Sequence, residues 1–425
     1  MLSHPEHLHR DINFKTNSPC AAGLNENPIK TVTVRDFDTL ASYVPAWDHL
    51  AQKAPQKIAT LLPGWVDAFL RHRLKPNERW FCSFAYAATE LVGVLPVVIT
   101  PHPILGIRWP LLRTPSDGYY TTLSGDIVLS AEQPDTALHG LLAEVNREVP
   151  GHLRLDLQAV RQTSPVWSAL ENTTGGYVAR RGQPLMYSFL DVRGDFDTYL
   201  SSFGHMSRNL RRFRKKLEKL GHVSIEVRTG SAASEDLLPD FLALEASGWK
   251  GRNGTAILNS PDETHFYTTL VRNFARCGYL EWHTIRVDEQ LIAAQLAVRC
   301  NASLCLLKSA FNEDFADCRP GTLLTEVTFR EGFSRPEIDE INSMSEFDAH
   351  GIWHVPRDEY IDVHLVRRNL LPLLLQLPRS VYQDHVQHRI PTMVKEAYRK
   401  LRHKKDHGED HKPRRAAEAT RLRQK

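Results

Sequence analysis

A proline and a glycine open a helix at a position where the helix N-terminus could bind an anion. The apolar strand 303–310 is followed by a segment without clear periodicity and then by the helical stretch 320–333. Pro320 suits the first helical position because its φ is already helical, and Gly321 lets a ligand approach the backbone closely. The helix dipole and the unpaired N–H groups of the first turn favour an anion such as a pyrophosphate. Ordinary connections that bind nothing show the same pattern, and these residues alone leave both interpretations open.

Two further places combine residue types that could contact a ligand. Trp249 offers a flat apolar wall, and Lys250 offers a cation for an acceptor that carries phosphate or carboxylate. A lysine followed by Gly251 is equally typical of a helix C-terminus. Lys308 lies inside an apolar strand, where a charged side chain is seldom buried without a partner. We therefore favour a site role for Lys308 over a position on an exposed strand edge.

A basic amphipathic helix is predicted from Ser207 to Gly221. Its apolar residues fall at helical spacing and are expected in the core: Leu210, Phe213, Leu217 and Leu220. Seven of its other residues are Arg or Lys. The charged face could contact phosphate groups, an anionic acceptor or a membrane surface, or it could contact only solvent.

Composition restricts the class of protein. A chain of 425 residues with 42% apolar and 24% charged residues predicts a soluble protein of two domains. The net charge of +3 arises from the end of the chain, where residues 395–425 hold 12 Lys or Arg and 5 Asp or Glu. The remaining sequence is mildly acidic, so its overall charge gives no reason to expect DNA as a partner.

Cysteine use and the chain ends predict a cytoplasmic location. The six cysteines are scattered and form no CxxC pair, which is typical of free thiols and argues against a disulfide framework or a zinc site. The N-terminus lacks the apolar core of a secretory signal, and the apolar run 370–377 is too short to cross a bilayer. His403, His407 and His411 share a helix face, but they lie in a highly charged tail, so we expect no metal.

The elements that must position these residues repeat in two halves. Each half is predicted to run strand, two helices, antiparallel strands, helix and strand, which describes a mixed, largely antiparallel sheet flanked by helices. Polar turns are expected after residues 87, 287 and 300, and a strand is expected over 337–344. The predicted organisation is a disordered tail at 1–30, domains at 31–185 and 186–380, and a basic tail at 381–425.

The order of elements and five short motifs resemble a known family. From Ser207 to about Arg367 the chain resembles the GNAT acetyltransferase domain of CelD-like cellulose-biosynthesis proteins, relatives of the FemAB double-GNAT transferases. The matching motifs are Ser207-Arg208-Asn209-Leu210-Arg211-Arg212, Leu244-Glu245 with Trp249-Lys250-Gly251, Ile292-Ala293-Ala294, Lys308, and Pro320-Gly321-Thr322-Leu323-Leu324. The sequence departs from the family at Phe311-Asn312-Glu313, where an aromatic-Asp-Glu is expected, and at His354.

The resemblance implies two tandem GNAT-like domains and an N- or O-acyltransferase that uses acetyl-CoA or another acyl-CoA. The CoA diphosphate would then contact Arg319, Gly321, Thr322 and Leu323. Lys250, Lys308 and Glu340 would be catalytic candidates, with Glu340 a candidate proton acceptor or an ordinary solvated strand residue. The acceptor, a small molecule or a glycan precursor, would contact Trp249, Arg208 and Arg212.

Two alternatives remain open at this point. A FemAB-like transferase would take an aminoacyl group from tRNA, which the basic helix and tail would hold. A scaffold without catalysis, suggested by Asn312 and His354, would serve a polysaccharide-synthesis assembly. Peripheral membrane contact through the basic helix or the tail is a further expectation.

Overall fold

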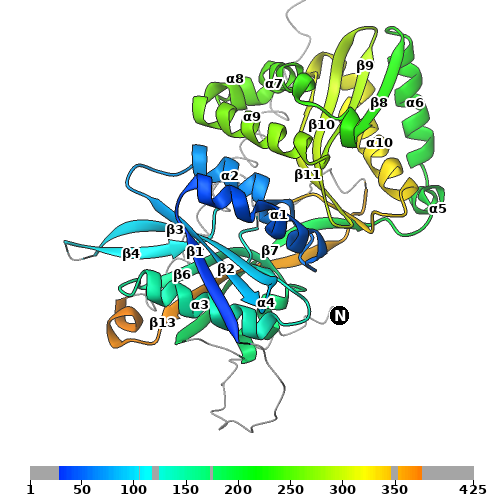
Figure 1. Ribbon diagram of the computed structural model, residues 1–425. Coiled ribbons are helices and arrows are strands. Elements are labelled where there is room, and N and C mark those ends of the chain that lie inside the picture. The colour runs from blue at the N-terminus through cyan, green and yellow to red at the C-terminus, as the bar shows by residue number, and fades with distance from the viewer. Residues whose placement is uncertain (1–27, 105, 117–123, 173–175, 346–352, 376–425) are drawn as a thin grey trace, which may run out of the picture.

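The computed structural model describes residues 28–104, 106–116, 124–172, 176–345 and 353–375 (Figure 1). Most of the predicted N-terminal tail and all of the predicted basic tail, including His403, His407 and His411, lie outside these residues. The first half contains strands β1 (Ile29–Val34), β2 (Arg79–Ala87), β3 (Glu90–Ile104), β4 (Ile107–Arg113), β5 (Val128–Leu129), β6 (Arg154–Arg161) and β7 (Tyr177–Asp191). Its α-helices are α1 (Phe37–Lys53), α2 (Pro63–His72), α3 (Pro134–Glu148) and α4 (Pro165–Asn172).

The second half repeats this order. Its strands are β8 (Val223–Thr229), β9 (Leu280–Val287), β10 (Gln290–Cys300), β11 (Ser303–Phe311), β12 (Glu340–Asn342) and β13 (Arg357–Arg367). Its α-helices are α5 (Phe196–Ser201), α6 (Met206–Glu218), α7 (Leu238–Ser247), α8 (Trp249–Arg252), α9 (Pro261–Arg276) and α10 (Pro320–Ser334). Among the described helices, none is long and apolar enough to span a bilayer.

The two halves share one continuous sheet. The strand order is β1-β2-β3-β4-β6-β13-β7-β12-β11-β10-β9-β8, and β5 pairs with β3. β13 follows the second half in sequence but lies between β6 and β7, while the end of β7 pairs with β12 (Figure 1). The predicted fold class, a mixed and largely antiparallel sheet flanked by helices, is confirmed. The domain limits stay a prediction, and the expected boundary after residue 185 falls inside β7.

The predicted hairpin turns are present, and each uses a residue with positive φ. Ala88, Asp288 and Asn301 have φ of 53°, 51° and 54°, values that tight two-residue turns require. The strand expected over 337–344 is shorter, because only Glu340–Asn342 pair with neighbours. Beyond it the Asn342 side chain accepts the Met344 N–H at 2.9 Å, and Met344 has a φ of 52°, so the backbone turns away.

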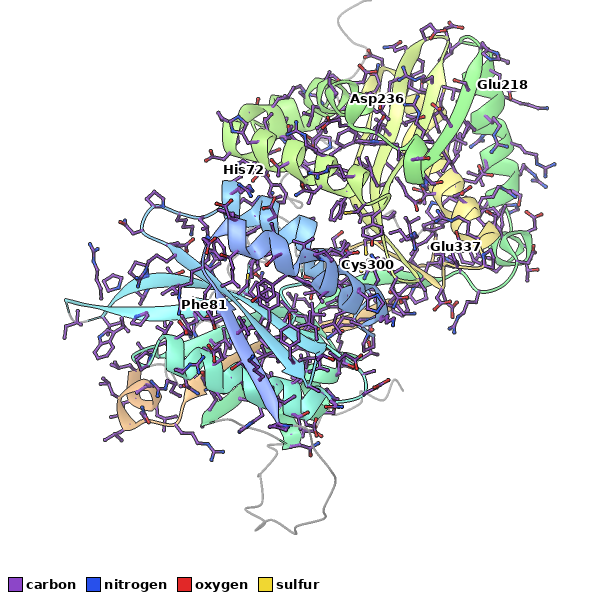
Figure 2. The ribbon with its side chains drawn as sticks, in the orientation of Figure 1. His72, Phe81, Glu218, Asp236, Cys300 and Glu337 are labelled. Carbon is purple, nitrogen blue, oxygen red and sulfur yellow. The ribbon has the colours of Figure 1, made fainter. Side chains whose placement is uncertain are left out.

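An apolar core joins the two halves through α2 and α9. Trp65 of α2 meets Phe266 of α9 edge-on, with ring centroids 5.4 Å apart. Arg73 lies 3.6 Å from the centroid of Phe266 and forms an ion pair with Glu263 at 2.7 Å. Figure 2 places His72 at this contact and Phe81 inside the first half. Both the sheet and this core contain residues from the two halves of the chain. The two halves therefore hold each other in position.

Candidate active site

Strand β11 has an irregular edge in the middle of the second half. It pairs in parallel with β12 only from Ser303 to Cys305, and no described strand covers that edge farther along. On its other side, β10 pairs Leu296 with Lys308 and Ala297 with Leu306, so Leu307 is an extra residue in a β-bulge. A bulge frees backbone groups from the ladder and re-aims them. The middle of β11 therefore has an extra residue on its β10 side and, on its other side, an edge that β12 does not cover.

The far end of β11 leads directly to the start of α10. Residues 313–318 form a 3₁₀ segment rather than an irregular loop, and Arg319 then takes a left-handed conformation with φ 52°. The N–H groups of Thr322 and Leu323 bond to the Arg319 carbonyl at 3.0 and 3.1 Å. The Gly321 N–H makes no hydrogen bond within the described part of the chain. The Arg319 side chain is exposed, whereas Leu323 is buried in the core.

Gly321 lies against an aromatic ring. A Cβ atom at this position would sit 3.3 Å from Cδ1 of Phe311, a side chain that is 39% exposed. Of the four residues expected to contact a diphosphate, Arg319, Gly321 and Thr322 have an exposed or half-buried position at the helix start, and Leu323 does not. Leu323 contributes its side chain to packing, and its N–H already closes the first helical turn.

The Trp249-Lys250-Gly251 motif forms a separate one-turn helix, α8, rather than the end of α7. Gly251 is required there because a Cβ atom would come within 1.8 Å of the Ala246 carbonyl oxygen. Lys250 Nζ lies 2.9 Å from Glu245 Oε1 and 3.3 Å from the Ser309 carbonyl oxygen of β11. Glu245 is buried, and its other oxygen accepts the Ile257 N–H at 2.9 Å. These contacts fasten α8 to α7 and β11.

Trp249 is exposed at the end of β11. Its side chain is half exposed, and its backbone N–H donates to Glu313 Oε1 at 2.8 Å. Arg252 bonds the other Glu313 oxygen, and this pairing lowers the pKa of Glu313, with a second contribution from the Trp249 N–H. Trp249, Lys250, Ser309 and Phe311 line one hollow, and an open polar groove of about 800 Å³ adjoins it between α7 and residues 312–314.

Lys308 is half-buried beside the bulge. Its Nζ lies 5.7 Å from the ring centroid of Tyr267 in α9, and its carbonyl accepts Gln295 Nε2 at 2.9 Å. Tyr267 belongs to the core between α7 and α9, whereas α10 covers the opposite face of the sheet. The Lys308 side chain and the start of α10 are therefore on different faces.

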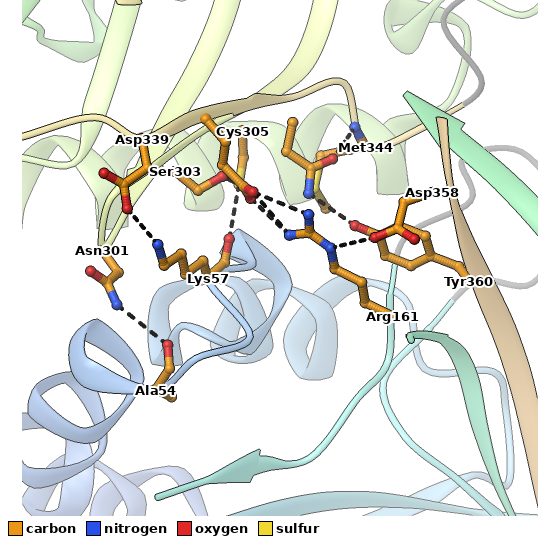
Figure 3. Close-up of polar contacts among 12 residues, drawn as sticks. Ala54, Lys57, Arg161, Asn301, Ser303, Cys305, Asp339, Met344, Asp358 and Tyr360 are labelled. Carbon is orange, nitrogen blue, oxygen red and sulfur yellow. Dashed lines mark hydrogen bonds and ion pairs between the residues drawn. The ribbon is translucent and has the colours of Figure 1, made fainter. Parts of the chain in front are cut away.

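Glu340 lies at the opposite end of β11 from Gly321. It pairs with Ser303, and the eight steps from there to Phe311 span about 26 Å at ~3.3 Å per residue. Arg161 of the first half binds both Glu340 oxygens at 2.9 and 3.1 Å and Asp358 at 3.0 Å (Figure 3). Burial opposes the Arg161 charge, yet Tyr360, Glu340 and Asp358 raise the pKa of Arg161 overall. This ion pair favours a structural role for Glu340 over that of a proton acceptor.

A basic face of α6 lies beside the start of α10. It consists of Arg208, Arg211, Arg212, Lys215, Lys216 and Lys219. All six side chains are exposed, and Lys216 Nζ approaches the Asp317 carbonyl oxygen at 3.4 Å. On the inner side, Leu210 and Leu217 are buried as predicted, but Leu220 is 56% exposed because α6 ends at Glu218.

The equivalent position in the first half is filled by the chain itself. β4 and β6 pair in parallel at Leu112 and Arg113, as β11 and β12 do. Gly125 then pairs with Gln158 of β6, and β5 pairs with β3. The segment 124–129 thus connects β6 to β3 across the sheet. The first turn of α3 carries Asp135, whose negative charge would repel an anion at that helix start. These features leave the second half as the better place for an anionic ligand.

Several site features could not be read from the sequence. The bulge at Leu307 depends on strand register, and Phe311 against Gly321 depends on the path of the 3₁₀ segment. The sequence offered no clear signal for Arg161, because it ends a strand that alternates polar and apolar residues, RLDLQAVR. Within the described residues, no group of three or more His, Cys, Asp or Glu side chains could hold a metal ion.

Comparison with known proteins shows which protein family part of the chain matches. Residues 204–344, less than half of the chain, match the acetyltransferase (GNAT) domain family. No curated protein matches the chain. The structure of FemX is similar, with a TM-score of 0.55 and 12% identity over 81% of this chain and 99% of that one.

Two other solved structures are similar at lower scores. The C-terminal domain of a putative lysylphosphatidylglycerol synthetase from Agrobacterium fabrum has a TM-score of 0.49 and 12% identity, covering 81% of this chain and 96% of that one. A tandem GNAT protein from the clavulanic acid biosynthesis pathway has a TM-score of 0.38 and 13% identity, covering 79% and 98%. The FemX likeness shows a shared fold, and the family match shows the class of chemistry. Residues 204–344 match a GNAT acetyltransferase domain, and the protein is an acyltransferase.

Proposed function

We propose that the protein is an acyl-CoA-dependent N- or O-acyltransferase whose donor lies along β11. One observation carries this proposal: β11 leaves β12 after Cys305 and continues as a bulged edge to the start of α10. The donor's diphosphate would meet the Gly321 N–H and the exposed Arg319 guanidinium, which can form charge-assisted hydrogen bonds. The thioester end would extend along the edge of β11 toward the bulge.

The chemistry needs a polarised carbonyl and a proton acceptor. A backbone N–H near Leu307 would hydrogen bond to the thioester oxygen as charge develops there. The acceptor amine or hydroxyl attacks the carbonyl carbon, the C–S bond breaks, and CoA leaves as the thiolate. The acceptor's proton passes to a base. Because Arg161 pairs with Glu340, water or a base supplied by the acceptor complex is the better candidate for this role.

The acceptor is proposed to be a cell-envelope or exopolysaccharide precursor, as in CelD-like proteins. Support comes from the sequence motifs and from the open polar groove beside the exposed Trp249. Asp240, Arg252, Arg286, Glu289 and Glu313 line this groove, and such polar groups suit a hydroxyl-rich acceptor. A functional link to polysaccharide-synthesis machinery is part of the same proposal.

Transfer from labelled donors tests the proposed function. The protein should move label from [¹⁴C]acetyl-CoA, or from a longer acyl-CoA, to an envelope glycan fraction, and it should bind CoA more tightly than pantetheine. A lack of both binding and transfer with every acyl-CoA would overturn the proposal.

A second candidate is transfer from aminoacyl-tRNA. The observation that favours it is the basic face of α6, whose cations suit a phosphate backbone. This candidate predicts tight, salt-sensitive tRNA binding, transfer of an aminoacyl label and no CoA binding. The same two labelled donors therefore separate the two candidates in one assay.

A further inference from the structure

The basic face of α6 carries charge that the protein does not neutralise. None of Arg208, Arg211, Arg212, Lys215, Lys216 and Lys219 forms an ion pair with a carboxylate of the described residues. By contrast, Arg214 on the neighbouring side of the helix pairs with Glu326 at 2.8 Å. Six like charges on about three helical turns repel each other, so an anionic partner would be favoured at this surface.

Exposed apolar side chains lie at the end of the same helix. Leu220 lies two residues beyond the end of α6 and is 56% exposed, and Ile225 of β8 is 45% exposed. Ile225 shares a surface hollow with Arg214 and Glu218 of α6, which places it beside this helix end. α6 lies on the outer side of the second half, away from the first half, and Figure 2 shows Glu218 at this outer edge (Figure 1).

We propose that this surface docks on an anionic phospholipid membrane. An exposed helix face with a row of Lys and Arg and with adjacent aliphatic side chains matches a lipid interface, where cations meet headgroups and aliphatic groups enter the acyl boundary. Single-stranded nucleic acid would instead call for aromatic side chains on which bases stack. The aromatic neighbour of these cations on the helix is Phe213, whose ring centroid lies 5.2 Å from the Arg212 guanidinium and whose side chain is half-buried against the core.

Docking would bring the start of α10 close to the membrane. Lys216 contacts the Asp317 carbonyl oxygen, three residues before Pro320, so the basic face and the helix start are adjacent. Resting on the proposed function, docking would hold the donor site near the lipid surface, an arrangement that suits a lipid-linked acceptor. Membrane docking itself stands apart from catalysis and is measured without any donor.

Vesicle flotation with the full chain tests this surface. The wild type should float with phosphatidylcholine vesicles that contain about one third phosphatidylglycerol, and it should not float with pure phosphatidylcholine. The variant R211E/K215E/K219E should lower the partition coefficient about tenfold or more. The matched control K30E/K53E/K75E makes the same charge change at exposed lysines elsewhere and should float like the wild type. Leu220→Ser should weaken the part of vesicle binding that persists at high salt. Circular dichroism should show that both triple variants are folded.

Three outcomes would overturn the proposal. The first is that R211E/K215E/K219E floats as well as the wild type. The second is that K30E/K53E/K75E loses as much vesicle binding as R211E/K215E/K219E. The third is that the protein binds bulk tRNA but not anionic vesicles. Loss of vesicle binding with intact acyl-CoA binding would separate this surface from the donor site. Unchanged vesicle binding of R211E/K215E/K219E together with weaker acyl-CoA binding would contradict the membrane proposal and leave the proposed function standing.

Discussion

Arg161 and Glu340 form a bidentate ion pair between strands that come from different halves of the chain. Arg161 ends β6, and Glu340 begins β12, which pairs with both β7 and β11. Lys57 makes a second bridge to Asp339 at 2.7 Å (Figure 3). The pair therefore holds the first half against the strand whose separation from β11 creates the uncovered edge.

Glu340→Gln is expected to lower stability rather than remove a catalytic base. Arg161 would lose one of its two partly buried carboxylate partners, which costs about 2–3 kcal/mol of unfolding free energy. Urea denaturation measures this loss, with Glu132→Gln as an exposed control. If stability were unchanged while kcat fell a thousandfold, Glu340 would be the base and the structural assignment would be wrong.

Lys250→Met should also act through stability. It leaves the Glu245 carboxylate buried without its cation, at a cost of about 2–4 kcal/mol. The double variant K250M/E245M replaces both charges and should recover part of that loss. Denaturation midpoints of the two variants test this. A K250M protein of normal stability without transfer activity would instead support a direct role in catalysis.

Asp126→Asn should stabilise the protein at alkaline pH. Burial raises the pKa of Asp126 to about 7, against the opposing effects of the Ser164 hydroxyl and the Ile127 N–H. The folded state thus holds its proton more tightly than the unfolded state, so stability falls as pH rises from about 4 through 7. The gain from Asn should reach about 2–4 kcal/mol at pH 8 and vanish near pH 4. Thermal unfolding across this range measures it, and a gain independent of pH would contradict the assignment.

Most of the order of elements could be predicted from local turn and helix signals, but strand β4 (Ile107–Arg113) was not predicted. The antiparallel strands β9, β10 and β11 were predicted from the polar turns at Asp288 and Asn301. The helix that follows them was predicted from Pro320 and Gly321. The position of β13 between β6 and β7, and the pairing of β7 with β12, could not be predicted, since hydrophobic periodicity gives a strand's faces but not its partners.

The candidate site was predicted less completely than the fold. Gly321, Trp249 and the basic helix lie near one end of β11, while Glu340 lies at the other end in an ion pair whose partner is 179 positions away in the chain. Lys250 and Glu245 illustrate the same difficulty, because a charged residue in a motif can serve the ligand or the fold. Only the partner's position in three dimensions decides between these roles.

The most direct test of the account is isothermal titration of the full chain with acetyl-CoA, compared between Gly321→Leu and Gly151→Leu. Gly151 has open space around its Cα, so it is a matched control for the same substitution, whereas a larger side chain at Gly321 meets Phe311. We predict one site per chain, because segment 124–129 fills the equivalent position in the first half. Affinity should fall at least about tenfold in Gly321→Leu, or roughly 1.4 kcal/mol, and stay unchanged in Gly151→Leu. Two sites per chain, unaltered binding by Gly321→Leu, or no binding of any acyl-CoA would contradict the account.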